Sequence, residues 1–478
     1  MLRRIDLFRR CRSTGFTILF FLIGASGIAQ EWSRFRGPNG SGTADASNLP
    51  TEFGPEHNVI WVTPMPRGLS SPVIVGDRIV LTAAEDGKLV TLAVAVDSGQ
   101  TLWRTELAPV RTGELFEQND PATPTPASDG TNVYVFFVDV GLVSYDANGR
   151  ERWRYELGPF DNHYGLAASP ILAGDSILLL CDQVASSFLV AIDKDSGKLR
   201  WHHEREGRIE SWTTPVLYPV GDSPQQVLVF GSGWVDAYDL DSGEHRWELP
   251  GVGEAPISSP VLAGSTLYVN TPDLGNDYGF PRFETLAIGD EDGDGRITES
   301  EMAKTEGWGE HHGWADRDHD GYLTAAEWNY VVERGSTPNY GLVAVALPPP
   351  GKSEGAAIRW SHKKSLPYIP SPIVYRDVIY LIRDGGIVTS LDPKSGRVHK
   401  RGRFSSAAGQ VYSSPVAADG KIFMGSVGGD VAVLSAAPEW EVLAVNELDE
   451  PVYATPAISD GRIYVRTQNR LYAFGLDP

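Results

Sequence analysis

The chain has 478 residues, of which 41% are hydrophobic, so it is long enough to bury a sizeable core. Its formal charge of −21 argues against nucleic acid and anionic membrane surfaces as partners. The plentiful glycine (51 residues) and proline (33) and the 10% aromatic content favour many short strands joined by tight turns.

The first 29 residues predict an export signal. Five arginines precede an apolar run from Phe16 to Ile23, and Gly27 and Ala29 are small residues before a cleavage point at Gln30. The apolar run is too short to span a membrane. We therefore expect an exported protein, periplasmic, cell-surface or secreted, without a membrane span after cleavage. A signal retained as an anchor is the alternative.

The chain has two cysteines, which limits the use of disulfides. Cys11 lies within the predicted signal, and Cys181 lies in an apolar run. The mature protein is therefore expected to fold without a disulfide, and Cys181 is expected to be a buried small hydrophobe.

A repeat runs through the rest of the chain. A hydroxyl residue and a proline recur before an apolar run, with successive prolines 52, 46, 45, 45, 112, 43 and 41 residues apart. Most of these intervals are close to 45, and the interval of 112 contains an insertion, so eight units are indicated. The pairs are Ser71-Pro72, Thr123-Pro124, Ser169-Pro170, Thr214-Pro215, Ser259-Pro260, Ser371-Pro372, Ser414-Pro415 and Thr455-Pro456.

Each unit predicts four short antiparallel strands, since apolar and polar residues alternate between turn signals such as Asp-Gly and Asp-Ser-Gly. Four strands cannot bury both faces of a sheet alone, so the units must stack as the blades of a β-propeller. The last unit lacks an outer strand, and residues 58–63 have the pattern to supply it. We therefore expect one all-β domain over 30–478, an eight-bladed monomeric propeller closed by its N-terminal strand.

A second motif in the units resembles a known family. Residues 191–201 and 237–247 both read Ala-x-Asp-x-x-Ser-Gly-x-x-x-Trp, and the glycine-to-tryptophan offset recurs at 99–103 and 149–153, whereas Lys400 replaces the tryptophan after Gly396. This motif is similar to the repeat of pyrroloquinoline-quinone-type propellers, which include quinoprotein alcohol dehydrogenases and the assembly factor BamB. The opening from Trp32 through Phe35 to Gly42 resembles exported bacterial members of that family.

The long interval contains an insertion at 274–338, in blade five, with two EF-hand-type loops at 290–301 and 316–327. Calcium takes six to eight oxygen ligands, and both loops supply carboxylates at positions 1, 3, 5 and 12, a carbonyl at position 7 and a threonine at position 9. The sequence therefore predicts two calcium ions. The predicted ligands are Asp290, Asp292, Asp294, Arg296, Thr298 and Glu301, and Asp316, Asp318, Asp320, Tyr322, Thr324 and Glu327.

The connector between the loops has only fourteen residues, 302–315, so the helices around it must be short. We expect weak calcium binding, in the range of extracellular modules. Removal of calcium should disturb this small α-helical subdomain and spare the propeller. His311 and His312 lie in the connector, where they are either exposed loop residues or transition-metal ligands.

Two functional classes remain after these observations. The family resemblance implies a dehydrogenase that uses pyrroloquinoline quinone, a central calcium and an aspartate base, often with adjacent disulfide-bonded cysteines. The chain has no adjacent cysteines and little length for an elaborated active site, so we do not expect it to bind pyrroloquinoline quinone. We expect instead a non-catalytic scaffold whose central funnel binds a protein, a peptide or a polar ligand. The funnel candidates are Arg67, Asn119, His163, Tyr164, Glu210, Trp212, Glu254, Tyr368, Tyr412 and Tyr453.

Overall fold

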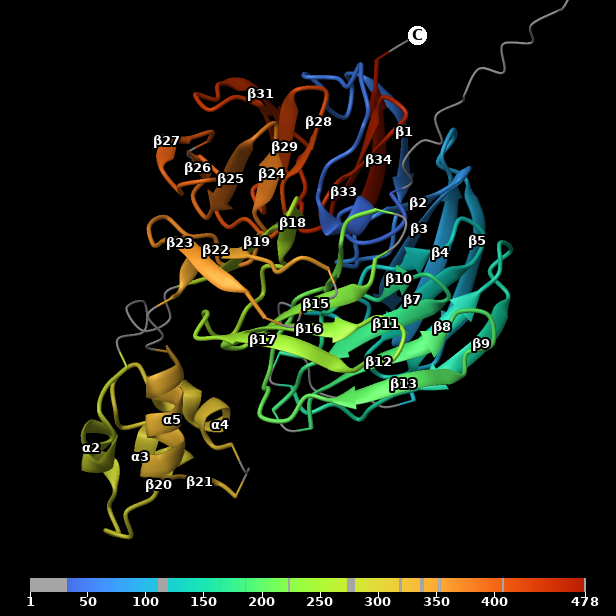
Figure 1. Cartoon of the computed structure of the whole chain (residues 1–478). Helices are drawn as coiled ribbons and strands as arrows, with labels where there is room; N and C mark the ends of the chain where they lie inside the picture. The colour runs from blue at the N-terminus through green and yellow to red at the C-terminus, as the bar shows by residue number, and fades with distance from the viewer. Residues whose placement is uncertain are drawn as a thin grey trace, which may run out of the picture.

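The structure is a computed structural model that describes residues 32–476, apart from 111–118, 163, 185, 222–223, 273–279, 318–319, 336–338, 351, 353 and 406–407. The predicted signal at 1–29, His163, Asp318 and both ends of the predicted insertion lie outside the described residues. The strands form eight four-stranded antiparallel sheets arranged in a ring (Figure 1). The fold is therefore an eight-bladed β-propeller, which confirms the predicted fold class.

The first four blades each use four strands in chain order, and the first strands of blades one, two and three contact one another in turn. Blade one contains β2 (Val73–Val75), β3 (Arg78–Glu85), β4 (Lys88–Ala95) and β5 (Thr101–Leu107). Blade two contains β6 (Ala127–Ser128), β7 (Val133–Phe137), β8 (Gly141–Tyr145) and β9 (Glu151–Glu156). Blade three contains β10 (Ile171–Ala173), β11 (Ser176–Cys181), β12 (Phe188–Asp193) and β13 (Leu199–Glu204). Blade four contains β14 (Val216–Tyr218), β15 (Gln226–Gly231), β16 (Trp234–Asp239) and β17 (His245–Pro250).

The other four blades complete the ring, and the last one includes a strand from the start of the chain. Blade five contains β18 (Val261–Ala263), β19 (Thr266–Thr271), β22 (Gly341–Ala346) and β23 (Ala357–His362). Blade six contains β24 (Ile373–Tyr375), β25 (Val378–Arg383), β26 (Ile387–Leu391) and β27 (Val398–Arg403). Blade seven contains β28 (Val416–Ala418), β29 (Lys421–Gly425), β30 (Asp430–Ser435) and β31 (Val442–Glu447). Blade eight contains β32 (Ala457–Ser459), β33 (Arg462–Arg466), β34 (Arg470–Gly475) and, antiparallel to β34, β1 (Val59–Pro64).

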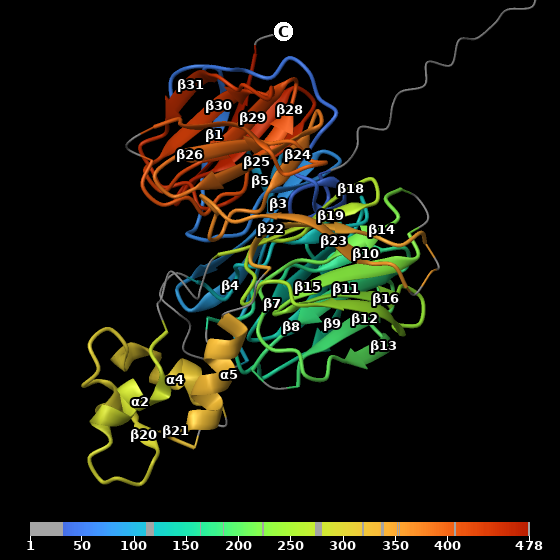
Figure 2. The same ribbon diagram turned by 60° about the vertical axis from the view of Figure 1, so that its left-hand side comes forward.

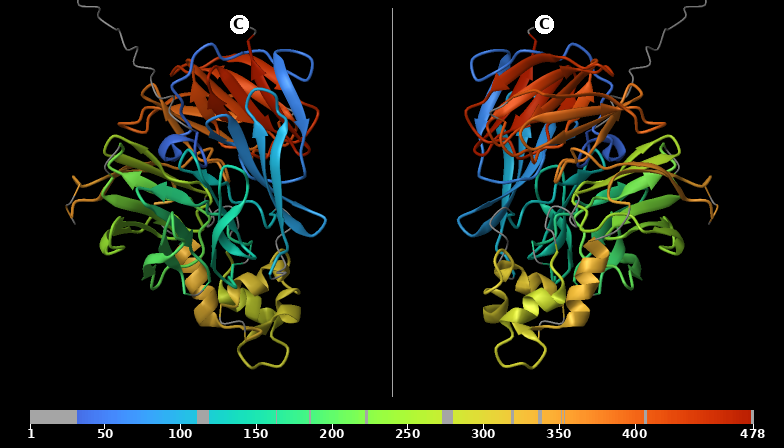
Figure 3. Two further views of the ribbon diagram at one scale, coloured as in Figure 1. Left: turned by 90° about the vertical axis from the view of Figure 1, so that its right-hand side faces the viewer. Right: turned by 90° about the vertical axis from the view of Figure 1, so that its left-hand side faces the viewer.

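A helical module interrupts blade five between β19 and β22, and it projects from one side of the ring (Figure 2). Its described elements are α2 (Phe283–Leu286), η2 (Ala287–Gly289), β20 (Ile297–Thr298), α3 (Glu299–Met302), η3 (Gly309–His311), α4 (His312–Ala315), β21 (Tyr322–Leu323) and α5 (Ala325–Gly335). It has its own core, in which Ile297, Leu323 and Trp328 are buried. Two side views place it at the end of the molecule away from the C-terminus (Figure 3). Within the described residues, no helix is long and apolar enough to cross a membrane.

Tryptophans of the repeat join neighbouring blades by covering a turn glycine of the next blade. An added Cβ atom on each of these glycines would lie only 2.5–2.7 Å from the indole ring. The pairs are Trp61–Gly99, Trp103–Gly149, Trp153–Gly197, Trp201–Gly243 and Trp360–Gly396. Lys400 replaces the tryptophan in blade six. Trp440 of blade seven packs against it, with the Lys400 ammonium 4.6 Å from the centroid of the Trp440 ring.

We expect Gly243→Ala to destabilise the protein by about 2–3 kcal/mol, since the new methyl group must displace the Trp201 ring and the backbone has a positive φ of 72°. Gly174→Ala is the matched control, because Gly174 also has a positive φ of 58° but has no atom within 4 Å of the added Cβ. Denaturant unfolding of both variants measures the difference. Equal losses would show that the tryptophan contact does not restrain this turn.

The N-terminal segment 32–44, here called the plug, crosses the channel of the ring. Its backbone accepts hydrogen bonds from Ile74, Ser128 and Ala417, which lie on the innermost strands of blades one, two and seven. Asn39, within η1 (Pro38–Gly40), exchanges two hydrogen bonds with the backbone of Leu217 in blade four. The plug therefore connects distant blades and closes one end of the channel.

Candidate functional site

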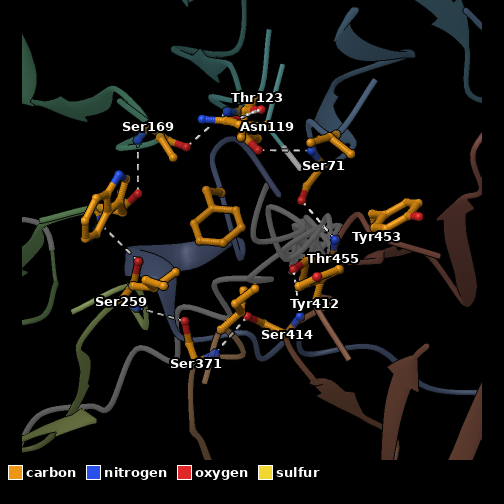
Figure 4. Close-up of a pocket in the computed structure, with 18 of the residues that line it drawn as sticks. Ser71, Asn119, Thr123, Ser169, Ser259, Ser371, Tyr412, Ser414, Tyr453 and Thr455 are labelled. Carbon is orange, nitrogen blue, oxygen red and sulfur yellow. Dashed lines mark hydrogen bonds between the residues drawn. The ribbon is translucent and has the colours of Figure 1, made fainter. Parts of the chain in front are cut away.

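Eight hydroxyl side chains form a closed ring around the channel, here called the hydroxyl ring, and Figure 4 labels six of them. Each backbone N–H in the ring donates to the hydroxyl oxygen of the equivalent residue in the next blade, at 2.9–3.1 Å. Every member directly precedes a repeat proline, which explains why this pair recurs in the sequence. The members are Ser71, Thr125, Ser169, Thr214, Ser259, Ser371, Ser414 and Thr455.

The assignment of Thr123-Pro124 to the second unit of the repeat is wrong by two residues. The segment contains two Thr-Pro pairs in succession, and it is Thr125 that donates to Ser169 and accepts from Ser71. Thr123 instead accepts from the backbone N–H of Asp120 at 3.1 Å. Spacing alone could not separate the two pairs, because only the contacts with neighbouring blades distinguish them.

The hydroxyl ring opens into a cavity of about 550 Å³. The residue two positions before each ring member also lines this cavity, since successive residues of an extended segment alternate in direction. These eight residues are Leu69, Thr123, Ala167, Trp212, Ile257, Ile369, Tyr412 and Tyr453. Phe35 lines the cavity from the plug. The cavity is therefore a funnel built by all eight blades and closed by the N-terminal segment.

Aromatic side chains form much of the funnel lining. Tyr412 and Tyr453 stack with ring centroids 5.7 Å apart, and Tyr164 meets Trp212 edge-on at 5.5 Å. The Trp212 indole N–H donates to the carbonyl of Gly165 at 3.0 Å, which fixes its ring. These surfaces suit flat or sugar-like groups, or the side chains of a peptide.

Six of the ten predicted funnel residues line the cavity: Asn119, Tyr164, Trp212, Tyr368, Tyr412 and Tyr453. Arg67, Glu210 and Glu254 are not among the lining residues. They lie four or five positions before the ring member of their blade, whereas the lining residue that all eight blades share lies two positions before it. Sequence reasoning missed the hydroxyl ring itself and Phe35; counting two residues back from each Ser-Pro or Thr-Pro pair would have located most of the lining.

His311 also lines the funnel, although it belongs to the helical module. Its neighbour His312 is 5% exposed, and its Nε2 lies 2.8 Å from the carbonyl oxygen of Ile297 in the first predicted calcium loop. The expectation of an exposed loop residue is therefore wrong for His312. The module is inserted between β19 and β22, at the end of blade five where the inner strand β18 begins. The connector between the two loops can therefore reach the funnel.

The first predicted calcium loop has carboxylates that converge on one point. Oxygens of Asp290, Asp292 and Asp294 all lie within 4.8 Å of one another. Gly295 has a positive φ of 81°, which allows the sharp bend at position 6. Glu301 accepts hydrogen bonds from the N–H groups of Thr298 and Glu291, at 2.8 and 3.0 Å, which lower the pKa of its carboxyl group to about 2.

The second loop repeats this arrangement. Glu327 accepts from the N–H groups of Arg317 and Thr324, at 3.0 and 2.9 Å, and Gly321 has a φ of 86°. Asp316 accepts from Gly321 through Oδ2, whereas its Oδ1 is buried and has no hydrogen-bond partner in the described part of the chain. A buried carboxylate oxygen without a donor fits a position that a cation would fill.

The remaining predicted ligands have consistent positions. Arg296 and Tyr322 occupy position 7, where only the carbonyl would bind, and their side chains stack at 4.0 Å. The two loops pair through β20 and β21, with Ile297 opposite Leu323. Thr298 caps α3 together with Glu301. Asp318 lies outside the described residues; the other predicted ligands of the two loops fit hard-cation sites of the calcium type.

The described residues that line the funnel do not match the donor set of a calcium-bound quinone. Among the described residues that line it there is no aspartate, glutamate, lysine or arginine, so a carboxylate base and carboxylate ligands are missing. Cys181 lies in β11, is fully buried, and has its pKa raised by burial. The described lining therefore lacks the carboxylates that the resemblance to quinoprotein dehydrogenases implies.

Comparison with known proteins gives the family. The sequence profile described as outer membrane protein assembly factor BamB matches residues 87–272 and 353–477, more than half of the chain. A protein of that name from Burkholderia pseudomallei is 31% identical over 209 residues, covering 43% of this chain and 49% of that protein. One from Alkalilimnicola ehrlichii is 29% identical over 213 residues, covering 43% and 50%. The chain thus spans about half the length of these relatives.

Solved structures share the fold at low sequence identity. The crystal structure of BamB from Moraxella catarrhalis has a TM-score of 0.55 at 13% identity, covering 87% of this chain and 99% of that one. A europium-containing methanol dehydrogenase has a TM-score of 0.59 at 11% identity, covering 94% and 99%. Likeness at this level concerns the fold alone. With the profile match over most of its blades, the chain belongs to the family of the outer membrane protein assembly factor BamB.

Proposed function

We propose that this protein is an exported, non-catalytic propeller scaffold that binds two calcium ions and holds a partner protein, a peptide or a polar ligand in its funnel. Relatives named outer membrane protein assembly factors support a scaffold role in the cell envelope. The paired loops at 290–301 and 316–327 support calcium binding, since their oxygens fit a hard cation. When bound, calcium would supply charge neutralisation and rigidity to these loops.

One observation connects the two parts of this proposal. His311 lines the funnel, and the adjacent His312 contacts the backbone of Ile297 in the first loop. A change in that loop on calcium binding therefore reaches the funnel wall through two consecutive residues. On this basis calcium regulates access to the funnel.

Thiol labelling tests this coupling. In the full chain with Cys11→Ser, the remaining Cys181 is buried and has a raised pKa, so it gives a low background. Tyr368→Cys then places one reactive thiol at the exposed edge of the funnel. We expect calcium to change its labelling rate about fivefold relative to a chelator. His311→Ala should abolish the change.

The control for this experiment is Val442→Cys on the exposed outer strand β31, whose labelling should be independent of calcium. Equal labelling of the Tyr368→Cys variant with and without calcium would contradict the coupling.

Calcium binding itself is tested by titration calorimetry. We expect two sites with dissociation constants of about 0.1–1 mM, and Asp316→Asn should remove one of them. Chelation should lower the stability of the helical module and leave the main thermal transition of the propeller unchanged. A large shift of the main transition would show that the ions stabilise the ring.

Alcohol-dependent dye reduction with pyrroloquinoline quinone and calcium added would contradict a non-catalytic role.

A further inference from the structure

The funnel of this acidic protein has an unusual charge environment. The chain contains 62 aspartate and glutamate residues, yet none occurs among the described residues that line the funnel. We propose that the floor of the funnel binds an anionic group, a carboxylate or a phosphate, carried by the ligand. This inference deepens the proposed binding role of the funnel and does not depend on calcium.

The hydroxyl ring supplies the hydrogen-bond donors. All eight members line the cavity, and each hydroxyl oxygen already accepts a backbone N–H from the neighbouring blade. Each hydroxyl therefore keeps its own proton to donate, and the N–H that it accepts polarises the O–H bond and strengthens it as a donor. Several such donors around one axis favour a ligand group with many acceptor atoms, such as a carboxylate or a phosphate.

Two arginines of the plug bring positive charge close to this ring, although neither side chain is among the residues that line the cavity. Arg34 and Arg36 are 6% and 0% exposed, and neither forms an ion pair in the described part of the chain. Each guanidinium donates through Nη2, at 2.7 Å, to the carbonyl of a proline that directly follows a ring member: Pro215 for Arg34 and Pro372 for Arg36. The two charges therefore lie next to the hydroxyl ring in blades four and six. Phe35, the residue between the two arginines in the sequence, lines the cavity.

These guanidinium groups are incompletely satisfied. The Nε atoms of both arginines and Nη1 of Arg36 are buried and have no hydrogen-bond partner among the described residues. Burial lowers the pKa of each to about 9, which still leaves them mainly protonated at neutral pH. An unpaired buried cation is costly, and the surrounding low dielectric leaves its field on the funnel floor weakly screened. An anion at the floor would offset that cost.

A purely structural role does not require two charges here. Trp32, Asn39 and Gly42 already attach the plug to the blades through backbone or amide hydrogen bonds. The arginines add one carbonyl contact each and retain three donors without partners among the described residues. Charge at this position is explained if the ligand supplies the counter-charge.

Calorimetry with charge-matched probes tests the proposal on the full chain. Sodium benzoate is compared with benzyl alcohol, which has the same ring without the charge, and acetyl-Ala-Ala-Phe with a free carboxylate is compared with its amide. Inorganic phosphate tests whether a free anion suffices. We expect at least one anionic probe to bind about tenfold more tightly than its neutral counterpart, because charge-assisted hydrogen bonds are stronger. The probe that binds identifies the source: small acid, peptide end or phosphate.

The double variant Arg34→Met/Arg36→Met separates binding from stability. We expect it to lose the preference for the anion while its thermal midpoint without ligand rises, because two unpaired buried charges are removed. Arg104→Met on strand β5 is the control, which should keep the preference for the anion and should not raise the thermal midpoint. Equal affinity of wild-type protein for charged and neutral probes, or no binding of any probe, would overturn the proposal even if the double variant does not fold. Calcium-dependent thiol labelling is independent of these outcomes.

Discussion

Arg205→Met is expected to destabilise the protein by about 3–5 kcal/mol, because it leaves two buried carboxylates without their shared cation. The Arg205 side chain is fully buried and donates from Nε to Asp182 at 2.7 Å and from Nη1 to Asp236 at 3.1 Å. Asp182 follows β11 of blade three and Asp236 lies in β16 of blade four, so the arginine joins two blades. Denaturant unfolding of the variant and the parent measures the loss.

The two carboxylates differ in how well they are compensated. Burial raises the pKa of Asp236, but Arg205, His245 and Arg208 outweigh it and hold that pKa below its usual range. Burial dominates at Asp182, whose pKa stays raised despite Arg205. Without Arg205 the raised folded-state pKa of Asp182 should move further above the unfolded value near 3.9, and the lowered pKa of Asp236, which keeps Arg208 and His245, should also rise. Groups with raised pKa values lose stability as pH rises, so the penalty of Arg205→Met should be smaller at pH 5 than at pH 8.

Arg104→Met is the control for this experiment. Arg104 also bridges two carboxylates, Glu85 and Glu106, but it does so on the partly exposed strand β5. Its loss should cost at most about 1 kcal/mol, since exposed ion pairs contribute little. If Arg205→Met lost no more stability than Arg104→Met, water would have to reach the buried cluster of Arg205, Asp182 and Asp236.

The ring could be predicted from sequence because its signals are local. Each blade has its own alternation of apolar residues and its own turn signals, so the spacing of the Ser-Pro and Thr-Pro pairs predicts eight blades without any long-range information. The two loops at 290–301 and 316–327 are equally local. Where two local signals overlap, as at Thr123 and Thr125, the sequence cannot choose, since the choice depends on a hydrogen bond to Ser169 in the next blade.

Contacts between distant segments could not be predicted in this way. Arg34 contacts Pro215 and Arg36 contacts Pro372, at separations of 181 and 336 residues, and no periodic pattern relates these positions. The position of His311 in the funnel lining was missed for the same reason, because it depends on how the inserted module folds back against blade five. The funnel floor and this part of its wall are thus consequences of closing the ring.

Trp61→Ala is expected to cost about 3–5 kcal/mol, as for a large buried aromatic residue, and to weaken the closure of the ring. Trp61 lies in β1, which pairs with β34 of blade eight. Its ring covers Gly99 of blade one, and its indole N–H donates to the carbonyl of Val96 at 2.8 Å. One side chain therefore joins the last blade to the first.

The matched control is Val62→Ala on the same strand, where the side chain is 47% exposed and its loss should cost within about 0.5 kcal/mol. Denaturant unfolding measures both variants. If Trp61→Ala were no more costly than Val62→Ala, the N-terminal strand would not hold the ring closed. If it is more costly as expected, opening at this junction exposes the edge of β34 to other chains, so the variant should also aggregate below its unfolding midpoint. Light scattering during the same titration measures this aggregation. The aggregation is expected because strands from both ends of the chain close the propeller.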